Sequence, residues 1–492
     1  MRQTGIASRP INGTLSKDLI PTKPVIFIYA MNEHTQQSVY PFLTRREWLN
    51  RVSNGFGAVA LSALMQEQEA LSQSSGSPLS PKQPHFEPKA KRVLHIYMAG
   101  GMPHQDNWDP NPELRKRGGQ KEGNRTLLAP QFEYQKFGQS GLELSEVWPN
   151  LGRHADDMAV IRSLWTDAPA HGAATVLMNT GDFTRVRPSV GSWALYGLGT
   201  ENQNLPGFIV LQPGNSPDAR VLSNAFLPGS LQGTFVNSQN TKMEEIIKNI
   251  QSDFASSKDQ RKQLDLLFKL NEIHKQKRQA DAKLEARIRT FELAYRMQTD
   301  AREAFDISGE SDETKERYGT SRQGRQMLIA RRLLERGVRF VQVWQGGWDL
   351  HNNIPNRNRQ LAGELDPGIG ALMDDLKESG LFNDTLIYLS SEFGRRSSQD
   401  GANGRGHNAS AMSTWLAGGG VKGGTAYGAT DELGAKAVEN KVHVKDLHAT
   451  ILHMLGFDHE KLIFPSGGRD MRLTEPSNKK PDGGQVVKGV IG

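Results

Sequence analysis

Short apolar segments that alternate with helical patterns constrain the fold of this chain more than any other feature. Five apolar segments have the length and composition of buried strands: 93–98, 158–161, 208–211, 338–344 and 385–389. Helical patterns lie among them at 173–179, 326–335 and 371–377, and another follows at 446–455. Parallel strands need long, usually helical, crossovers, so this alternation predicts an α/β fold with a mostly parallel, doubly wound sheet.

Length and composition fit a soluble globular protein. The chain has 492 residues, of which 36% are hydrophobic and 23% charged, so it is long enough for one large elaborated domain or for two domains. The net charge of +6 is spread along the sequence among carboxylates and comes with no nucleic-acid-binding motif. We therefore expect no nucleic-acid partner. No apolar run of about 20 residues predicts a transmembrane helix in the mature chain.

The amino-terminal region has the pattern of an export signal. Arg45 and Arg46 precede a weakly apolar stretch at 55–65, which is typical of twin-arginine signals, although a surface helix with a basic start is the alternative. Such a signal would begin closer to Met31 than to residue 1. We expect an export region at 1–70 and a periplasmic or secreted protein.

The rest of the chain divides by composition. A Ser-, Pro- and Gln-rich stretch predicts a linker at 71–90, followed by an α/β domain at 91–475. Long helical periodicity with many charges predicts a helical elaboration of that domain at 240–310. Residues 476–492 are expected to form a tail.

Polar side chains gather where two predicted strands end. Asp349 and His351 follow the strand at 338–344, and Glu392 follows the strand at 385–389. Open α/β sheets bind ligands at the carboxyl ends of their strands, so these side chains can share one point, and His407 is a further candidate from a later Gly-rich segment. The chain has no cysteine, so a metal there must use oxygen and imidazole ligands.

Several motifs together resemble a known family. They are Arg45-Arg46-Glu47, the segment 100–110 (GGMPHQDNWDP), 347–351 (GWDLH), 391–395 (SEFGR), 404–407 (GRGH) and 446–452 (DLHATIL). They are similar to a secreted domain-of-unknown-function family common in planctomycetes, which is often named sulfatase-like and is placed beside alkaline phosphatases and sulfatases. The resemblance covers nearly all of the chain after Arg45 and implies an alkaline phosphatase-like fold.

The resemblance also implies a set of metal ligands in superfamily order. Asp106 matches the early aspartate, Asp349 and His351 the Asp/His pair, Glu392 the further carboxylate and His407 the last histidine. Two departures bear on a second metal. The carboxylate at 392 is followed by Phe instead of His, and the Asp-x-His pair is more tightly spaced than usual. One or two divalent ions are therefore expected.

The position that matches the family nucleophile holds a histidine. Counting nine residues back from Thr180-Gly181 leads to His171, at the start of the predicted helix. His171 is either a phosphoryl acceptor or an additional metal ligand or substrate contact, and Thr175, farther from the helix amino terminus, is a poorer nucleophile. The absence of cysteine excludes the cysteine-derived nucleophile of sulfatases.

The predicted chemistry is metal-dependent hydrolysis of a phosphate or sulfate ester. Carboxylate and imidazole ligands suit Zn, Mn or Fe better than Ca or Mg. Arg395 and Arg405 flank the ligands and could pair with an anionic ester, for instance on a sulfated or phosphorylated polysaccharide. Each residue alone also has a structural interpretation, such as a packed histidine or a Glu392–Arg395 bridge. The alternative function is a non-catalytic secreted binding or cell-envelope protein that retains the fold.

Overall fold

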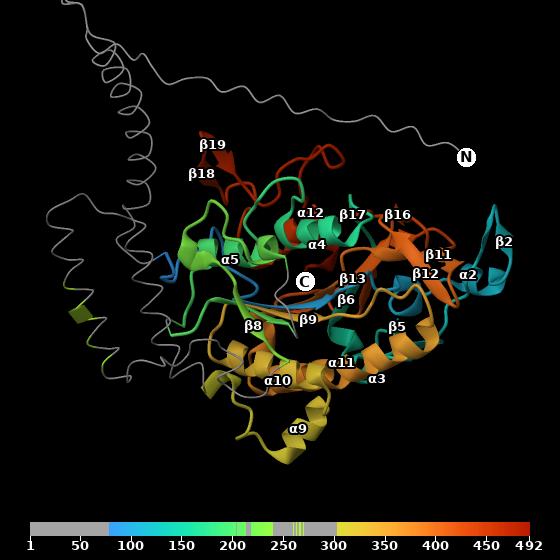
Figure 1. Cartoon of the computed structure of the whole chain (residues 1–492), viewed down its shortest axis with the longest axis horizontal. Coiled ribbons are helices and arrows are strands. Elements are labelled where there is room, and N and C mark those ends of the chain that lie inside the picture. Colours follow the sequence, from blue (N-terminus) through green and yellow to red (C-terminus); the bar gives the residue numbers. More distant parts are fainter. Residues whose placement is uncertain are drawn as a thin grey trace, which may run out of the picture. The chain divides into compact units, whose positions relative to one another are not determined.

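The computed structural model describes residues 78–202, 204–212, 218–239 and 303–492, together with five single positions between 259 and 269. Within the compact unit Ser72–Gly492, these residues form one central sheet with helices on both faces (Figure 1). The predicted export region and its Arg45-Arg46 pair lie outside the described residues, as does most of the predicted helical elaboration at 240–310.

The central sheet has nine strands among the described residues and is mostly parallel. Its order is β14 (Thr425–Tyr427), β6 (Met158–Trp165), β13 (Met412–Gly418), β10 (Thr385–Ser390), β1 (Arg92–Met98), β9 (Phe340–Gln345), β7 (Phe208–Gln212) and β8 (Thr234–Asn237), and β17 (Val442–His443) pairs with β6. Only β13 runs antiparallel, to both β10 and β6, among the pairings of this sheet in the described residues. The predicted mostly parallel sheet is confirmed.

Helices cover both faces of the sheet, as the doubly wound prediction requires (Figure 1). One face carries α4 (His171–Thr180), α5 (Val190–Leu198) and α12 (Val444–Met454); the other carries α3 (Pro149–Gly152), α9 (Asp312–Tyr318), α10 (Arg322–Glu335) and α11 (Ile354–Glu378). Strand β1 shows why two cores form. Leu94 and Ile96 pack into the core with α10 and α11, whereas Val93 and Tyr97 pack into the core with α5 and α12, because successive side chains point to opposite faces.

Smaller elements surround the sheet. They are α2 (Pro112–Arg117) and the two-stranded pairs β2 (Lys121–Glu122) with β3 (Arg125–Thr126), β4 (Tyr134–Phe137) with β5 (Leu142–Ser145), β11 (Gly394–Asp400) with β12 (Gly404–Asn408), β15 (Ala429–Thr430) with β16 (Ala437–Glu439) and β18 (Phe464–Ser466) with β19 (Arg469–Met471). The β11–β12 hairpin matters most for function, because it carries several of the predicted site residues.

Helix α11 differs most from its prediction. The sequence predicts a helix only at 371–377, but the helix begins at Ile354 and continues through Pro367. Proline normally interrupts a helix because it lacks an N–H group and clashes with the preceding turn. Here α11 packs along α3, α9 and α10, and we attribute its continuity to this tertiary packing.

The predicted linker and tail are ordered where they are described. The N–H of Lys82 donates to the Leu198 carbonyl at 2.9 Å, and that of His85 donates to the Gly456 carbonyl at 2.9 Å. At the other end Val490 is fully buried, and the N–H of Gly492 donates to the Gly420 carbonyl at 2.9 Å. Residues 78–90 and 476–492 therefore belong to the folded body, which the sequence placed at 91–475.

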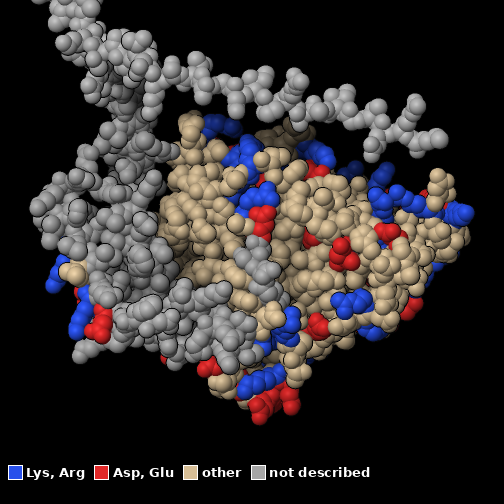
Figure 2. Space-filling view, viewed as in Figure 1, with Lys and Arg blue, Asp and Glu red and all other residues tan. Residues whose placement is uncertain are grey.

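Charge and hydropathy follow the expectation of a globular protein. Basic and acidic side chains are interspersed over the face in Figure 2. Among the described residues, no helix combines the length and apolar character needed to span a membrane.

Candidate metal centre

Neighbouring strands bring the candidate residues to one edge of the sheet. Strand β1 lies between β9 and β10 and is parallel to both, so the loops after these three strands meet at the same edge. Gly100, after β1, has a φ of 125°, and a Cβ atom there would lie 2.3 Å from the backbone nitrogen of Asp349. A glycine is therefore needed for the loops after β1 and β9 to approach this closely.

Three histidines surround one carboxylate oxygen at this edge. The Nε2 atoms of His171, His351 and His407 lie 3.3, 3.0 and 3.3 Å from Oδ1 of Asp349. Ligand atoms of His171, Asp349 and His407 all lie within 4.8 Å of one another, which is compact enough to hold one metal ion. His351 adds a fourth potential ligand, because its Nε2 is also 3.1 Å from Nε2 of His407.

The other nitrogen of each ring is held by an acceptor. Nδ1 of His171 lies 2.7 Å from Glu392, Nδ1 of His351 lies 2.6 Å from Asp400, and Nδ1 of His407 lies 3.2 Å from the Pro169 carbonyl. Carboxylates and carbonyls accept hydrogen bonds, so in the tautomer that suits a metal ligand each Nδ1 donates its proton to this acceptor. In the neutral rings, all three Nε2 lone pairs then face Asp349.

This arrangement fits a cation. Lone pairs on two Nε2 atoms 3.1 Å apart repel each other unless a proton or a metal ion lies between them. Nε2 of His171 is also shielded from solvent and has no hydrogen-bond partner among the described residues. Histidines that ligate metals through Nε2 normally donate Nδ1–H to a carboxylate or carbonyl, as all three do here.

Glu392 supports His171 and does not join the group of ligand atoms around Asp349. Its side chain is buried, and Oε1 accepts hydrogen bonds from His171 and from the Gly100 N–H at 2.8 Å. Oε2 accepts one from the Tyr97 hydroxyl at 3.2 Å. The sequence predicted a metal ligand at Glu392 and left His171 open between a phosphoryl acceptor, an additional metal ligand and a substrate contact. The geometry favours the metal at His171 and a supporting role for Glu392.

The same contacts shift two pKa values. The hydrogen bond to Glu392 raises the pKa of His171 above its ordinary value, against the opposing effect of burial. Burial, and then the negative charge of Glu392, raise the pKa of the Tyr97 hydroxyl well above its usual range. Tyr97 is therefore a neutral donor that orients Glu392, while Glu392 orients His171.

Arg395 is buried beside the cluster and holds Asp349. Its Nη2 lies 2.5 Å from Oδ1 of Asp349, and its other donors contact the carbonyls of Gly101 and Arg405 at 2.5 and 2.8 Å. Burial opposes ionisation of Asp349, but the hydrogen bond and charge of Arg395 outweigh it and lower the pKa of Asp349 to about 2. The carboxylate is ionised at neutral pH, and Arg395 is not free to bind an ester.

Two predicted site residues form a separate buried pair. Nε of Arg405 lies 2.8 Å from Oδ2 of Asp106, and both side chains are fully buried. Arg405 also donates to the carbonyls of Leu128 and Ala129, and Asp106 accepts from the Gln131 N–H at 2.7 Å. The expectations of a metal ligand at Asp106 and an anion-binding group at Arg405 are therefore corrected, because each satisfies the other inside the protein.

Asp400, which was not among the predicted site residues, anchors His351. Asp400 is the last residue of β11. The β11–β12 hairpin packs closely against the loop after β9, and only a glycine fits at position 404, because a Cβ atom there would lie 1.9 Å from the carbonyl carbon of His351. No local motif marks Asp400. Its role depends on a register shift in the hairpin between Arg395 and Gln399, which residue order alone does not show.

Sheet order, helix layers and the histidine cluster define a doubly wound α/β protein with a candidate His/Asp metal site at the carboxyl edge of its sheet. The family model described as "Protein of unknown function (DUF1501)" matches residues 90–483, and the chain belongs to this family. No curated protein matches the sequence.

Solved structures with a similar chain path are distant in sequence. A phosphonate monoester hydrolase from Silicibacter pomeroyi is 12% identical, with 81% of this chain and 76% of that chain covered and a TM-score of 0.35. The PsFucS1 sulfatase from Pseudoalteromonas sp. is 13% identical, with 76% and 69% covered and a TM-score of 0.35. An alkaline phosphatase superfamily protein from Vibrio parahaemolyticus is 12% identical, with 82% and 74% covered and a TM-score of 0.31.

Proposed function

We propose that this protein is an exported, metal-dependent hydrolase of phosphate or sulfate esters. The observation that carries the proposal is the convergence of three Nε2 atoms on Asp349, with each Nδ1 anchored by an acceptor. His171, His351, His407 and Asp349 would hold one divalent ion. Three imidazoles and one carboxylate favour Zn, Mn or Fe over Ca or Mg.

A bound divalent metal would polarise an ester oxygen and lower the pKa of a coordinated water. The chain's own residues keep the ligands in place: Arg395 holds Asp349 ionised, and Glu392 fixes the ring of His171. Glu392 holds Nδ1 of His171, and Nε2 faces Asp349 and the other two rings, so we assign His171 as a ligand and not as the phosphoryl acceptor. Water is then the proposed nucleophile.

One observation favours the non-catalytic alternative. Arg395 and Arg405, the two cations expected to bind the ester, are buried and paired with Asp349 and Asp106. A secreted binding or cell-envelope protein could retain the metal centre without a guanidinium group for substrate. An anionic substrate, such as a sulfated or phosphorylated polysaccharide, is proposed only for the hydrolase.

Metal content and ester turnover test the two functions together. Protein purified without chelator should contain about one Zn, Mn or Fe per chain and should hydrolyse aryl phosphate or aryl sulfate. Asp349→Asn should lose both properties, whereas Asp374→Asn, a surface carboxylate paired with Arg153, should retain both. Bound metal without turnover would support the binding protein. A stable wild-type protein without metal would also support the binding protein and would contradict the metal-dependent hydrolase.

Export is the sequence-based part of the proposal and rests on Arg45 and Arg46. We likewise propose an export region at 1–70 ahead of the folded domain, as in planctomycete-type secreted members of the resembling family. Replacing both arginines by lysine should keep the precursor in the cytoplasm, as measured by fractionation. Normal export of that variant would contradict the twin-arginine interpretation.

A further inference from the structure

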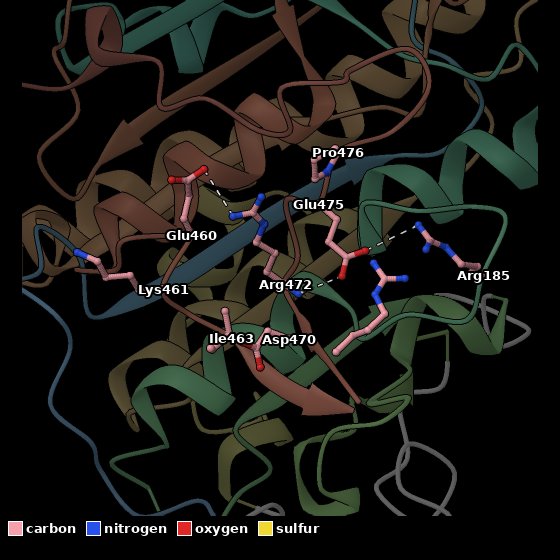
Figure 3. A pocket seen from close by; sticks show the side chains of 9 residues that line it. Arg185, Glu460, Lys461, Ile463, Asp470, Arg472, Glu475 and Pro476 are labelled. Atoms are coloured by element: carbon pink, nitrogen blue, oxygen red, sulfur yellow. Dashed lines mark hydrogen bonds and ion pairs between the residues drawn. The ribbon is translucent and has the colours of Figure 1, made fainter. Parts of the chain in front are cut away.

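An open pocket of about 560 Å³ lies at the β18–β19 hairpin (Figure 3). Residues from three parts of the chain line it: Arg185 from the loop after α4, Lys461 from the loop after α12, and Arg469 and Arg472 from β19 and the residue after it. None of the proposed metal ligands is among its lining residues. This pocket is therefore a separate feature of the molecule.

Cations line this pocket and the cavity beside it. Arg185, Arg469 and Arg472 line it, and a small adjoining cavity that shares Arg472 adds Arg187 and Lys445. The last two are 5% and 2% exposed, so water cannot fully solvate their charges. Burial lowers the pKa of Arg187, against the opposing charge of Glu475.

Two carboxylates lie among these five cations. Glu475 is 2.7 Å from Arg187 and 3.8 Å from Arg185. Asp182 is 2.6 Å from Arg185 and 3.7 Å from Arg187. Both carboxylates are thus shared between the same two arginines, and neither forms an ion pair with Arg469, Arg472 or Lys445 in the described residues.

Two further carboxylates, Asp470 and Glu460, line the pocket. In Figure 3, Asp470 lies on the far side of the pocket from Glu475, and Glu460 approaches Arg472 from the other end. The contact between Glu460 and Arg472 is 3.5 Å, and the Glu460 side chain is 57% exposed, so it neutralises Arg472 weakly. Arg469 has no ion pair among the described residues.

We propose that this pocket binds a tetrahedral oxyanion, the sulfate or phosphate group of a larger ligand. Guanidinium forks from Arg469 and Arg472 match the oxygens of such a group, and the anion would balance the buried charges of Arg187 and Lys445 behind them. The volume is larger than one such ion and leaves room for the molecule that carries it. The inference does not depend on the metal centre or on catalysis.

Calorimetric titration with inorganic sulfate and with inorganic phosphate tests the pocket. The full chain should carry Asp349→Asn, so that the proposed metal centre does not contribute to binding. We expect one saturable site, and the ion that binds more tightly identifies the preferred group. Replacing both Arg469 and Arg472 by Gln should weaken binding by about tenfold or more, because hydrogen bonds to charged groups are lost.

Matched variants separate binding from folding. Arg220→Gln removes another surface arginine, which is paired with Asp218 outside the pocket, and should leave binding unchanged. Arg472→Lys keeps the charge but loses the planar fork, and should weaken binding less than the double variant. Absence of saturable binding to the parent protein would overturn the proposal. The proposal would also be overturned if Arg472→Lys and the double variant both bound the ion as tightly as the parent does.

Discussion

Two arginine–aspartate pairs in this protein have the same chemistry and different surroundings. Arg395 and Arg405 are both fully buried, and each contacts an aspartate within 2.8 Å. Asp349, the partner of Arg395, is 48% exposed and faces three histidine rings, whereas Asp106 is fully buried beside Arg405 and backbone groups. The first pair therefore borders a candidate metal centre, and the second pair is part of the core. Residue type does not distinguish them; their neighbours do.

The largest expected effect is a difference in unfolding free energy between variants of the two pairs. Asp106→Asn should lower the unfolding free energy by about 3 kcal/mol or more, because Arg405 is left as a buried charge without a carboxylate. Asp349→Asn should cost no more than about 1 kcal/mol, because Asp349 is half-exposed and water screens its ion pair. Urea unfolding of the metal-free proteins measures both. Equal losses would mean that both pairs are structural.

The next effect tests His171 as a ligand. His171→Ala should weaken metal binding by more than about 100-fold, since losing a ligand should exceed the loss caused by removing an outer partner. A phosphoryl acceptor would behave differently, because turnover would vanish while metal binding persisted. Competition with a metal-sensitive dye measures the affinity. His448→Gln serves as the control. His448 is buried and lies 2.8 Å from the Met178 carbonyl, so this variant should keep the wild-type affinity for the metal.

A smaller effect compares the two carboxylates that anchor histidines. Glu392→Gln should weaken metal binding by about 10- to 100-fold, because the neutral amide orients His171 less strongly. Asp400→Asn should have a smaller effect, because its exposed contact with His351 is screened by water. The same dye assay distinguishes them. If Asp400→Asn lost more metal affinity than Glu392→Gln, then Asp400 in the β11–β12 hairpin would be the more important anchor of the ligand histidines.

The smallest effect contrasts a core histidine with those of the centre. Burial lowers the pKa of His448 to about 4, against the hydrogen bond to the Met178 carbonyl. Its contribution to stability is therefore complete above the unfolded pKa and is lost as the pH falls toward 4. At pH 5.5 this loss is about 1 kcal/mol relative to pH 8. Unfolding curves should show this difference for wild type and not for His448→Gln.

Local pattern predicted much of the fold. Segments such as 93–98 and 385–389 are apolar on both faces, as buried parallel strands require, and they became β1 and β10. The antiparallel strand β13 was not predicted, because strand direction depends on partners far away in sequence. The full length of α11 was also missed, since its packing against neighbouring helices overrides the breaking tendency of Pro367.

Prediction of the site was incomplete, because it missed Asp400 and included residues that have other roles. Asp349, His351 and His407 lie together, as expected from the strand ends. Asp106 and Arg405 do not join them, because each found a buried partner in the other. Such pairings depend on distances between segments about 300 positions apart, which residue order does not contain.

By itself, the sequence determined the alternation of strands and helices, the absence of cysteine ligands and the placement of polar residues after strand ends. These features follow from local hydrophobic patterns and from residue chemistry. The tertiary structure alone decided that Glu392 and Asp400 anchor histidines and that Arg395 holds Asp349. The physical reason is that the role of a charged side chain depends on its burial and on its partners across the fold, and both arise only when distant segments pack together.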